Sequence, residues 1–310
     1  MSSAAPRVSD LLLLAAALVW GTSYGVTKTA VAVYPVLGFL AIRFCLTALL
    51  LAPAWRGVGL ALALKTLRAG LPLGLMLLGI FIAETYGVAL TTASNAAFLI
   101  STCVVLTPIV EWGVIGTRPS WRTIAAAMIA LLGALLIAAG ARLSFNAGDW
   151  LILLAALLRA GMVSFTKRLT RDPAISSLVL TAVQTGTVGL GCLLIGMFAV
   201  PGGLTLPPMT PQFWGATLYL VLFCTIFAFF AQNYAIRQSS PTRAALLMGT
   251  EPVFGALFAT IWLAESLTPS AWIGGVLIVA ASFLGVMAPR RVNRAQLTPP
   301  AVTSEVAGEV

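Results

Sequence analysis

The chain has few charged residues and no histidine. Only 9% of its 310 residues are charged, whereas 60% are hydrophobic and the mean hydropathy is +1.01. A soluble domain keeps roughly a quarter of its residues charged. A chain so poor in charge is unable to cover a surface that faces water. We therefore expect an integral membrane protein whose outer surface mostly faces lipid.

Other absences exclude several kinds of site. With no histidine and only four cysteines, all inside apolar segments, a zinc or haem site has almost no ligands, so we expect no metal and no cofactor. No segment matches the phosphate-binding loop G-x-x-x-x-G-K-[ST], so nothing in the sequence supports ATP hydrolysis. The connections between apolar segments are too short to form a soluble domain.

Long apolar segments make up most of the chain. A helix needs roughly 20 mostly apolar residues to cross a bilayer, and turn-formers and charges divide the chain into ten such segments. We therefore predict an all-α fold with ten transmembrane helices. The expected spans are residues 10–32, 36–54, 69–90, 95–115, 121–139, 149–167, 175–200, 211–236, 244–264 and 270–288.

Lysine and arginine lie at every second junction between these spans. Of the eighteen Lys and Arg residues, all but four lie at one set of alternate junctions; the exceptions are Arg142 at the other set and Lys28, Arg43 and Arg159 inside spans. Short cytoplasmic loops retain Lys and Arg, so we expect both termini in the cytoplasm. The net charge of +9 then forms a girdle beside anionic lipid headgroups, which argues against a nucleic-acid partner.

The second half of the chain resembles the first. Residues 86–99 match residues 234–247 at an offset of 148, and Val26-Thr27-Lys28 aligns with Phe165-Thr166-Lys167 at an offset of 139. The alternative is a chance likeness between apolar helices. Halves of five spans each must be inverted relative to one another, and inverted repeats let a midplane site open to either side. We predict repeats at residues 10–140 and 148–288 and a flexible cytoplasmic tail at 289–310.

Short motifs within the predicted spans resemble those of a known family. Trp20-Gly21-Thr22-Ser23 in the first span, Glu251-Pro252 in the ninth and Glu265 at its end resemble the EamA-type module of the drug/metabolite transporter (DMT) superfamily. The matching junction of the first half, residues 116–119, lacks the glutamate. The resemblance implies a ten-helix transporter of a bacterial inner membrane. Within the superfamily the chain looks most like the YddG group of amino-acid exporters.

Ionisable residues inside spans are costly and usually face a partner or a water-filled cavity. The expected depths place Glu251 and Arg159 near the midplane, where they can pair. Glu84 lies in the outer half of its span, as do Lys28 and Arg43, so it can pair with either. Each of these ion pairs either links helices structurally or serves as a site for substrate or protons. For Glu251 the functional reading is favoured, and it can carry a proton if transport is proton-coupled.

Polar aromatic residues complete the expected site. Trp20 and Tyr24 share one helix face, and Tyr86 and Tyr234 are equivalent in the two halves. Proline at 108 and 252, in the fourth span of each half, is expected to form bends that let a helix gate. We expect the substrate cavity between the halves. Its predicted lining is Trp20, Tyr24, Tyr86, Phe98, Arg159, Met162, Tyr234, Met248 and Glu251.

These features together predict a secondary transporter, not an enzyme. We expect it to export small amphipathic metabolites, amino acids including aromatic ones above all, across the inner membrane by alternating access. An exporter of drugs or other metabolites with the same fold is the first alternative, and a channel or an intramembrane enzyme is less favoured. The expected partners are a small-molecule substrate, the lipid bilayer and, if transport is coupled, protons. Nothing in the sequence indicates an obligate protein partner.

Overall fold

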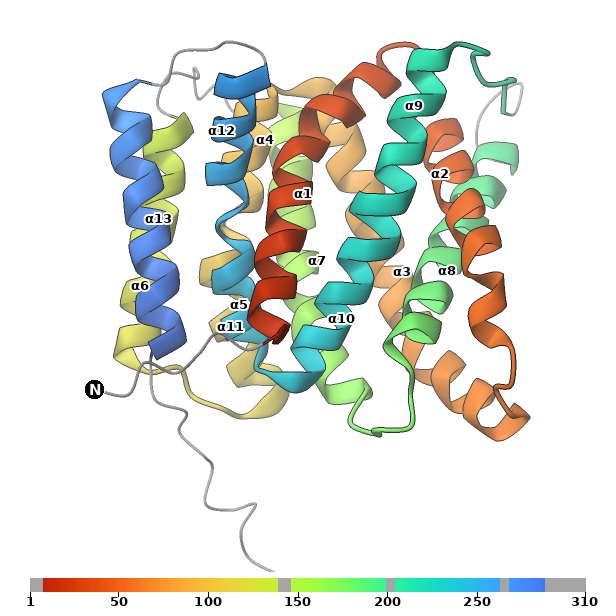
Figure 1. Ribbon diagram of the computed structural model, residues 1–310, viewed down its shortest axis with the longest axis horizontal. Coiled ribbons are helices and arrows are strands. Elements are labelled where there is room, and N and C mark those ends of the chain that lie inside the picture. Colours follow the sequence, from red (N-terminus) through yellow and green to blue (C-terminus); the bar gives the residue numbers. More distant parts are fainter. Residues whose placement is uncertain (1–7, 139–145, 199–203, 263–267, 288–310) are drawn as a thin grey trace, which may run out of the picture.

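The computed structural model describes residues 8–138, 146–198, 204–262 and 268–287. Arg142, Glu265 and the tail at 289–310 lie outside the described residues. Within these ranges the chain is helical and contains no β-strand (Figure 1). The first half comprises α1 (Val8–Val31), α2 (Val36–Leu51), the 3₁₀ helix η1 (Ala52–Trp55), α3 (Leu60–Leu90), α4 (Ala93–Ile100), α5 (Cys103–Ile115) and α6 (Trp121–Ala138). The second half comprises α7 (Ala147–Leu169), α8 (Ser177–Phe198), α9 (Pro211–Tyr219), the π-helix η2 (Leu220–Phe227), α10 (Ala228–Gln238), α11 (Pro241–Met248), α12 (Glu251–Trp262) and α13 (Pro269–Met287).

The helices account for ten membrane crossings. Eight helical segments of the described residues are long and apolar enough to span a bilayer. The other two crossings are α13 and the ninth span, which is broken into α11 and α12. The fourth span is broken too, into α4 and α5, while α9, η2 and α10 form one continuous eighth span.

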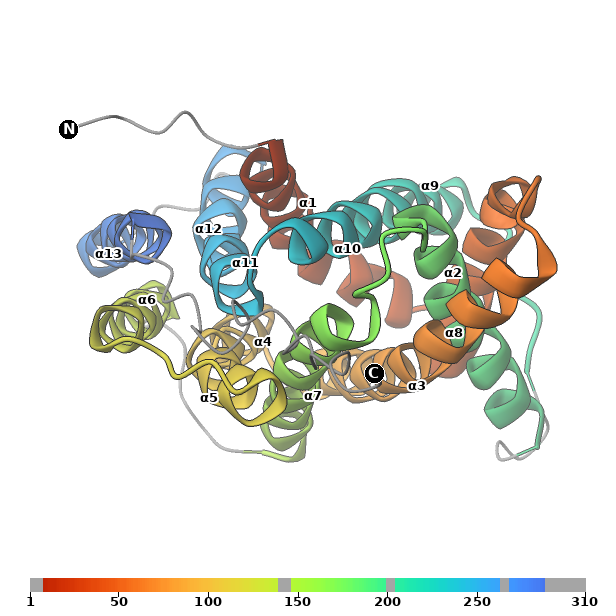
Figure 2. The ribbon, with the colours of Figure 1, turned by 90° about the horizontal axis from the view of Figure 1, so that it is seen from below.

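The pairing of helices has the symmetry of an inverted repeat. Helix α2 packs on α8 and α6 packs on α13, so each pairs with its own counterpart in the other half. Helix α3 packs on α7, and correspondingly α1 packs on α10. Exchanging the two halves leaves this set of pairs unchanged. Seen along the spans, α6 and α13 form an outlying pair beside the other helices (Figure 2).

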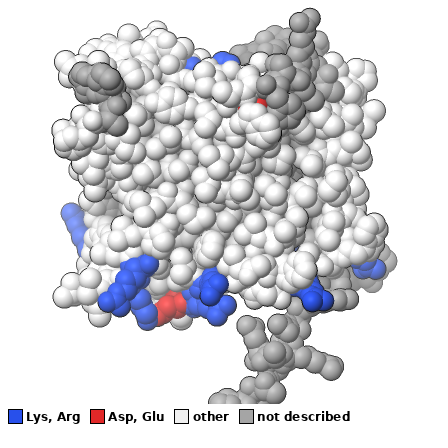
Figure 3. Space-filling view, turned by 180° about the vertical axis from the view of Figure 1, so that it is seen from behind, with Lys and Arg blue, Asp and Glu red and all other residues white. Residues whose placement is uncertain are grey.

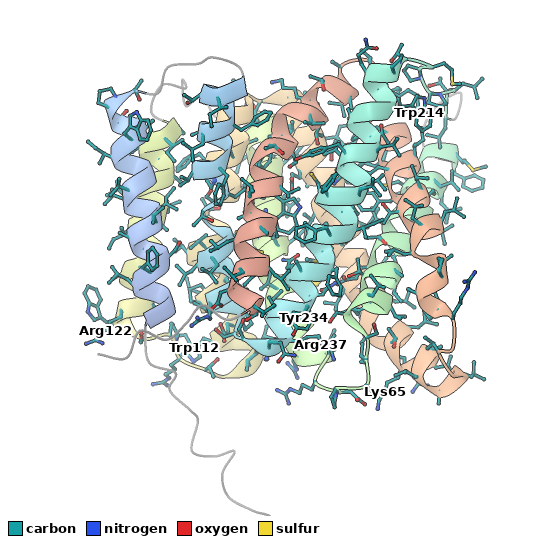
Figure 4. The ribbon with its side chains drawn as sticks, viewed as in Figure 1. Lys65, Trp112, Arg122, Trp214, Tyr234 and Arg237 are labelled. Atoms are coloured by element: carbon teal, nitrogen blue, oxygen red, sulfur yellow. The ribbon has the colours of Figure 1, made fainter. Side chains whose placement is uncertain are left out.

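Most of the basic residues lie at one end of the helices, which we call the basic face (Figure 3). Lys65, Arg122 and Arg237 all lie there, whereas Trp214 lies at the other end, the opposite face (Figure 4). Helix α1 starts at the basic face, and α7, its counterpart, starts at the opposite face (Figure 1). The structure thus gathers on one face the cations that the sequence distributes over alternate junctions.

The third helix begins nine residues earlier than expected, at Leu60 instead of residue 69. Lys65 and Arg68 interrupt the apolar run, so the sequence predicts that they precede the helix. Lys and Arg are good helix formers, and at the end of a spanning helix their heads can reach water while their stems cover apolar surface. The charges therefore mark where α3 leaves the apolar region, not where the helix ends.

Helices α1 and α12 approach each other closely at Gly21. A Cβ atom built there would lie 2.7 Å from the carbonyl oxygen of Glu251 and 2.7 Å from the amide nitrogen of Gly255, whereas a Cβ atom at Gly25 would meet nothing within 4 Å. Small residues allow such backbone contact between membrane helices. In the Gly21-x-x-x-Gly25 motif, therefore, only Gly21 is required for packing.

We expect Gly21→Ala to destabilise the protein and Gly25→Ala to leave it nearly unchanged. The added methyl group at 21 meets backbone atoms, which are unable to move as a side chain can, and overpacking of this kind costs about 1–3 kcal/mol. Thermal unfolding in detergent should show a lower midpoint for Gly21→Ala alone. Equal midpoints for the two variants would show that the α1–α12 contact is not tight.

Candidate functional site

A cavity lies inside the helix bundle, between the two halves. Its volume is about 40 Å³, which holds roughly three water molecules, since each needs at least about 10–15 Å³. The lining residues come from α1, α2 and α3 of the first half and from α7, α10 and α12 of the second. Their polar and aromatic members are Trp20, Ser23, Tyr24, Thr27, Arg43, Phe81, Glu84, Thr85, Arg159, Phe229, Gln232 and Glu251.

An ion pair crosses this cavity. Arg159 Nη2 on α7 lies 3.2 Å from Glu251 Oε2 on α12, and the two residues are only 8% and 5% exposed. The guanidinium carbon of Arg159 also lies 4.6 Å from the ring centre of Trp20, a cation–π contact that is stronger away from water. The pair predicted from depth alone is therefore present.

Trp20 and Arg159 occupy equivalent positions in the two halves. Each lies ten residues after the aspartate in the first turn of its helix, Asp10 in α1 and Asp149 in α7. Two equivalent residues of an inverted repeat can touch only if both lie near the pseudo-two-fold axis. The contact between them therefore places the ion pair close to the axis on which the halves meet.

The indole of Trp20 is fixed from the other side by an irregular helix. Its Nε1 donates a hydrogen bond of 2.8 Å to the carbonyl oxygen of Cys224, which belongs to the π-helix η2. Phe229 packs against the indole edge with ring centres 5.3 Å apart. π-helical turns are rare, but those that occur are frequently found at functional sites. Here the irregular turn holds the aromatic wall of the cavity.

Breaks in two helices determine where Glu251 lies. The fourth span is interrupted between α4 and α5 at Ser101-Thr102, and the ninth span between α11 and α12 at Gly249-Thr250, 148 residues later in both cases. Glu251 is the first residue of α12, where the partial positive charge of a helix N-terminus favours a carboxylate. The break thus brings both a carboxylate and a helix end to the cavity.

Two further side chains line the cavity with buried polar atoms that lack a hydrogen-bond partner of ordinary geometry in the described part of the chain. They are Tyr24, through its hydroxyl, and Gln232, through both of its side-chain polar atoms. Gln232 is only 1% exposed, and a buried polar group without a partner is costly. Groups of this kind, facing a cavity, are suited to bind a polar solute. The sequence indicates Gln232 by its amide inside an apolar span, although the predicted lining does not include it.

The expected pairing of Glu84 with Lys28 or Arg43 is not present as a direct contact. Lys28 Nζ donates instead to the carbonyl oxygen of Thr91, at 2.8 Å. Arg43 Nε donates to Thr225 Oγ1 at 2.9 Å, and the Arg43 guanidinium also lies over the Phe44 and Phe81 rings. The position of each charged residue along its span predicted which of them lie at the same depth in the membrane. It did not predict which side of the helix each side chain faces.

Tyr86 and Tyr234 lie outside the cavity. Tyr86 is 36% exposed on the bundle surface, and Tyr234 lines a second pocket of about 670 Å³ at the basic face, beside Arg237 (Figure 4). Each tyrosine is two residues from a cavity residue, Glu84 and Gln232 respectively. Two residues turn a helix by about 200°, so these tyrosines point away. Two residues at equivalent positions in the repeats therefore need not face the centre of the bundle.

The other predicted residues divide in the same way. Met162 is buried and lines the cavity. Phe98 and Met248 pack within the apolar core and do not line the cavity. Pro252 is the second residue of α12, where its missing N–H costs nothing. Pro108 lies inside α5, beyond the break in the fourth span.

Comparison with known proteins gives the family. The model of the EamA-like transporter family matches residues 7–139 and again residues 146–287. This chain belongs to that family. It is therefore a membrane transporter of the drug/metabolite superfamily.

Individual relatives are similar over most of their length. A transporter of Archaeoglobus fulgidus is 28% identical over 88% of this chain and 84% of its own. The inner membrane transporter YedA of Escherichia coli is 29% identical over 86% and 87%. A probable terminal-alkyne amino-acid exporter of Streptantibioticus cattleyicolor is 29% identical over 62% and 63%. One crystal structure has the same fold, with a TM-score of 0.73 over 89% of this chain and 95% of the other at 16% identity.

We expect Glu251→Gln to destabilise the protein through Arg159. The change leaves a buried guanidinium without its charged partner, at a cost on the order of 3–5 kcal/mol. Adding Arg159→Gln should recover most of that loss, because no buried charge then remains. Unfolding midpoints of the single and double variants measure both effects. A single variant as stable as the unmodified protein would show that the pair is solvated or weak.

Proposed function

We propose that this transporter exports amino acids by alternating access, with the Arg159–Glu251 pair as the centre of the substrate site. The observation that carries the proposal is one fixed positive and one fixed negative group across a buried cavity. An amino acid carries an ammonium and a carboxylate, and neither tolerates an apolar environment alone. The substrate ammonium can take the place of Arg159 beside Glu251, and the substrate carboxylate can take the place of Glu251 beside Arg159. No buried charge is then left without a partner.

The groups beside the pair suit the rest of such a substrate. Tyr24 and Gln232 can complete the hydrogen bonds of a carboxylate or an ammonium group, and Glu84 supplies a second carboxylate for the ammonium. Trp20 and Met162 form an apolar wall, and aromatic and thioether groups accommodate varied side chains. The relative named as a probable amino-acid exporter supports the same substrate class.

The size of the cavity indicates how binding proceeds. A volume of about 40 Å³ holds a few water molecules but no amino acid. Binding therefore has to widen the cavity, and separating Arg159 from Glu251 is the direct way to do so. The helix breaks at Ser101-Thr102 and Gly249-Thr250 are suited to this change, because residues at the ends of helices can absorb a change in backbone dihedral angles.

Counterflow of radiolabelled amino acids in proteoliposomes tests the substrate site. We expect saturable exchange for the unmodified protein and an at least tenfold loss for Trp20→Ala or Glu251→Gln. Tyr86→Ala is the matched control, since it removes an aromatic ring on the surface and should leave exchange unchanged. Runs with and without a pH gradient show whether protons, carried by Glu84 or Glu251, take part.

Three outcomes would contradict this proposal. Unsaturable flux would indicate a channel. Saturable exchange of other metabolites or drugs, with no response to any amino acid, would replace the substrate class while keeping the transport mechanism. Wild-type kinetics in Trp20→Ala and Glu251→Gln would show that the substrate site lies elsewhere in the protein.

We further propose that the basic face is cytoplasmic, in accordance with the retention of Lys and Arg in cytoplasmic loops. In a cysteine-free background, a single cysteine at Leu206 should react with a membrane-impermeant thiol reagent added to intact cells. A single cysteine at Ala174 should react only in inside-out vesicles. Both positions are exposed, so access depends on the side of the membrane. The reverse pattern would show that the basic face lies outside the cytoplasm.

A further inference from the structure

The first helix of each half carries the same pair of charged residues at its ends. Asp10 and Lys28 in α1 correspond to Asp149 and Lys167 in α7, all at the offset of 139. Both aspartates are almost completely buried, although both lie in the first turn of their helices. Because the halves are inverted, Asp10 lies at the basic face and Asp149 at the opposite face (Figure 1).

At the opposite face, one junction receives contacts from both of these helices. Lys28 Nζ donates to the carbonyl oxygen of Thr91, and the hydroxyl of Thr91 donates to Asp149 Oδ1 at 2.6 Å. Thr91 connects α3 to α4. The lysine contact stays within the first half. The aspartate contact joins the second half to the first.

At the basic face a similar arrangement flanks the equivalent junction, with Arg237 in the last turn of α10 and Arg243 in the first turn of α11. Lys167 Nζ donates to the carbonyl oxygen of Arg237 at 2.6 Å. Arg243 donates to Asp10 through two hydrogen bonds, from Nε at 3.0 Å and from Nη2 at 2.8 Å. Here too the lysine contact lies within one half, and the aspartate contact joins the two halves.

We infer that Asp10–Arg243 and Asp149–Thr91 are two latches, one at each face, that open alternately during transport. The inference rests on the alternating access proposed above. Opening at one face has to break contacts between helices of the two halves at that face while those at the other face hold. The aspartate contacts meet that requirement, whereas the lysine contacts move with their own half and hold each junction in place.

The two latches differ in strength. The Asp10–Arg243 latch is a charged pair with two hydrogen bonds, and the Asp149–Thr91 latch is a single bond from a hydroxyl group. Two-pronged arginine–carboxylate pairs are the stronger kind. A further contact between the halves reinforces the basic face, where Glu111 Oε2 accepts from the amide of Thr242 at 2.8 Å. The latch at the basic face is therefore the stronger of the two.

Accessibility of the cavity from each side tests the latches. Ser23 lines the cavity, so a single cysteine there, in a cysteine-free full-length background, reports whether an impermeant thiol reagent can enter. Labelling rates are compared in inside-out and right-side-out vesicles. We expect Asp10→Asn to raise the rate from the basic face about tenfold, the change produced by losing about 1.4 kcal/mol. We expect Thr91→Val to raise the rate from the opposite face by a smaller factor.

The choice of variants separates the latches from general damage. Thr91→Val removes the latch hydroxyl but leaves Asp149 to cap α7 through Asn146, which Asp149→Asn would disturb. Reversing the charges, with Asp10→Arg and Arg243→Asp together, should return labelling from the basic face toward the original rate. This rescue also distinguishes a broken latch from a misfolded protein.

An exposed ion pair between the halves provides the matched control. Lys65 and Asp172 form a salt bridge at the basic face, and the Lys65 side chain is 58% exposed. The hydrogen bond from Lys65 lowers the pKa of Asp172, so this carboxylate remains charged at neutral pH. Exposed pairs contribute little, and Asp172→Asn should change both labelling rates by less than a factor of two.

Each result either supports or overturns the inference. Opposite shifts in Asp10→Asn and Thr91→Val, with rescue by charge reversal, support it. Unchanged rates, or a rise from the same face in both variants, overturn it. Labelling needs no substrate, so opposite shifts without amino-acid counterflow would refute the proposed substrate and keep the latches. Normal counterflow with unchanged labelling would refute the latches and keep the proposed function.

Discussion

The buried ion pair between Arg159 and Glu251 is the interaction on which the rest of the structure depends. Removing two charges from water is costly, and their attraction offsets this cost only when the geometry is good. The surrounding residues provide that geometry. Trp20 covers the guanidinium, the π-helix η2 fixes Trp20, and the absence of a side chain at Gly21 brings α1 against the start of α12. Several irregular features of the fold thus serve one pair of charges.

The duplication supplies a symmetric frame, but the centre of the molecule is not symmetric. The helix breaks fall at equivalent positions in the two halves, and the pairs of helices exchange with one another. At the axis, however, Trp20 stands opposite Arg159, and the residue equivalent to Glu251 is Cys103. Symmetry in the frame permits motion toward either face. At the centre, the loss of symmetry leaves one positive and one negative side chain facing each other.

Charge is used differently at the ends of the spans and in their middle. At the ends, cations reach lipid headgroups or cap helix carbonyl groups, as Lys28 and Lys167 do. In the middle, every charged group has to find its partner within the bundle or face the cavity. Most of the cations thus lie at the ends of the spans, whereas Arg159 and Glu251, inside the spans, meet at the cavity.

The sequence by itself determined the class of protein, the number of spans and the pair at the centre. These follow from properties that add along the chain: apolar length, the alternation of Lys and Arg, and the depth at which Arg159 and Glu251 fall. Tertiary structure alone decided which side of a helix faces the cavity. Tyr86 and Tyr234 point away, and Lys28 binds Thr91 instead of Glu84. A residue's depth depends only on its position along one helix, whereas its partners depend on how neighbouring helices are rotated about their axes. That rotation is determined by packing between segments far apart in the chain.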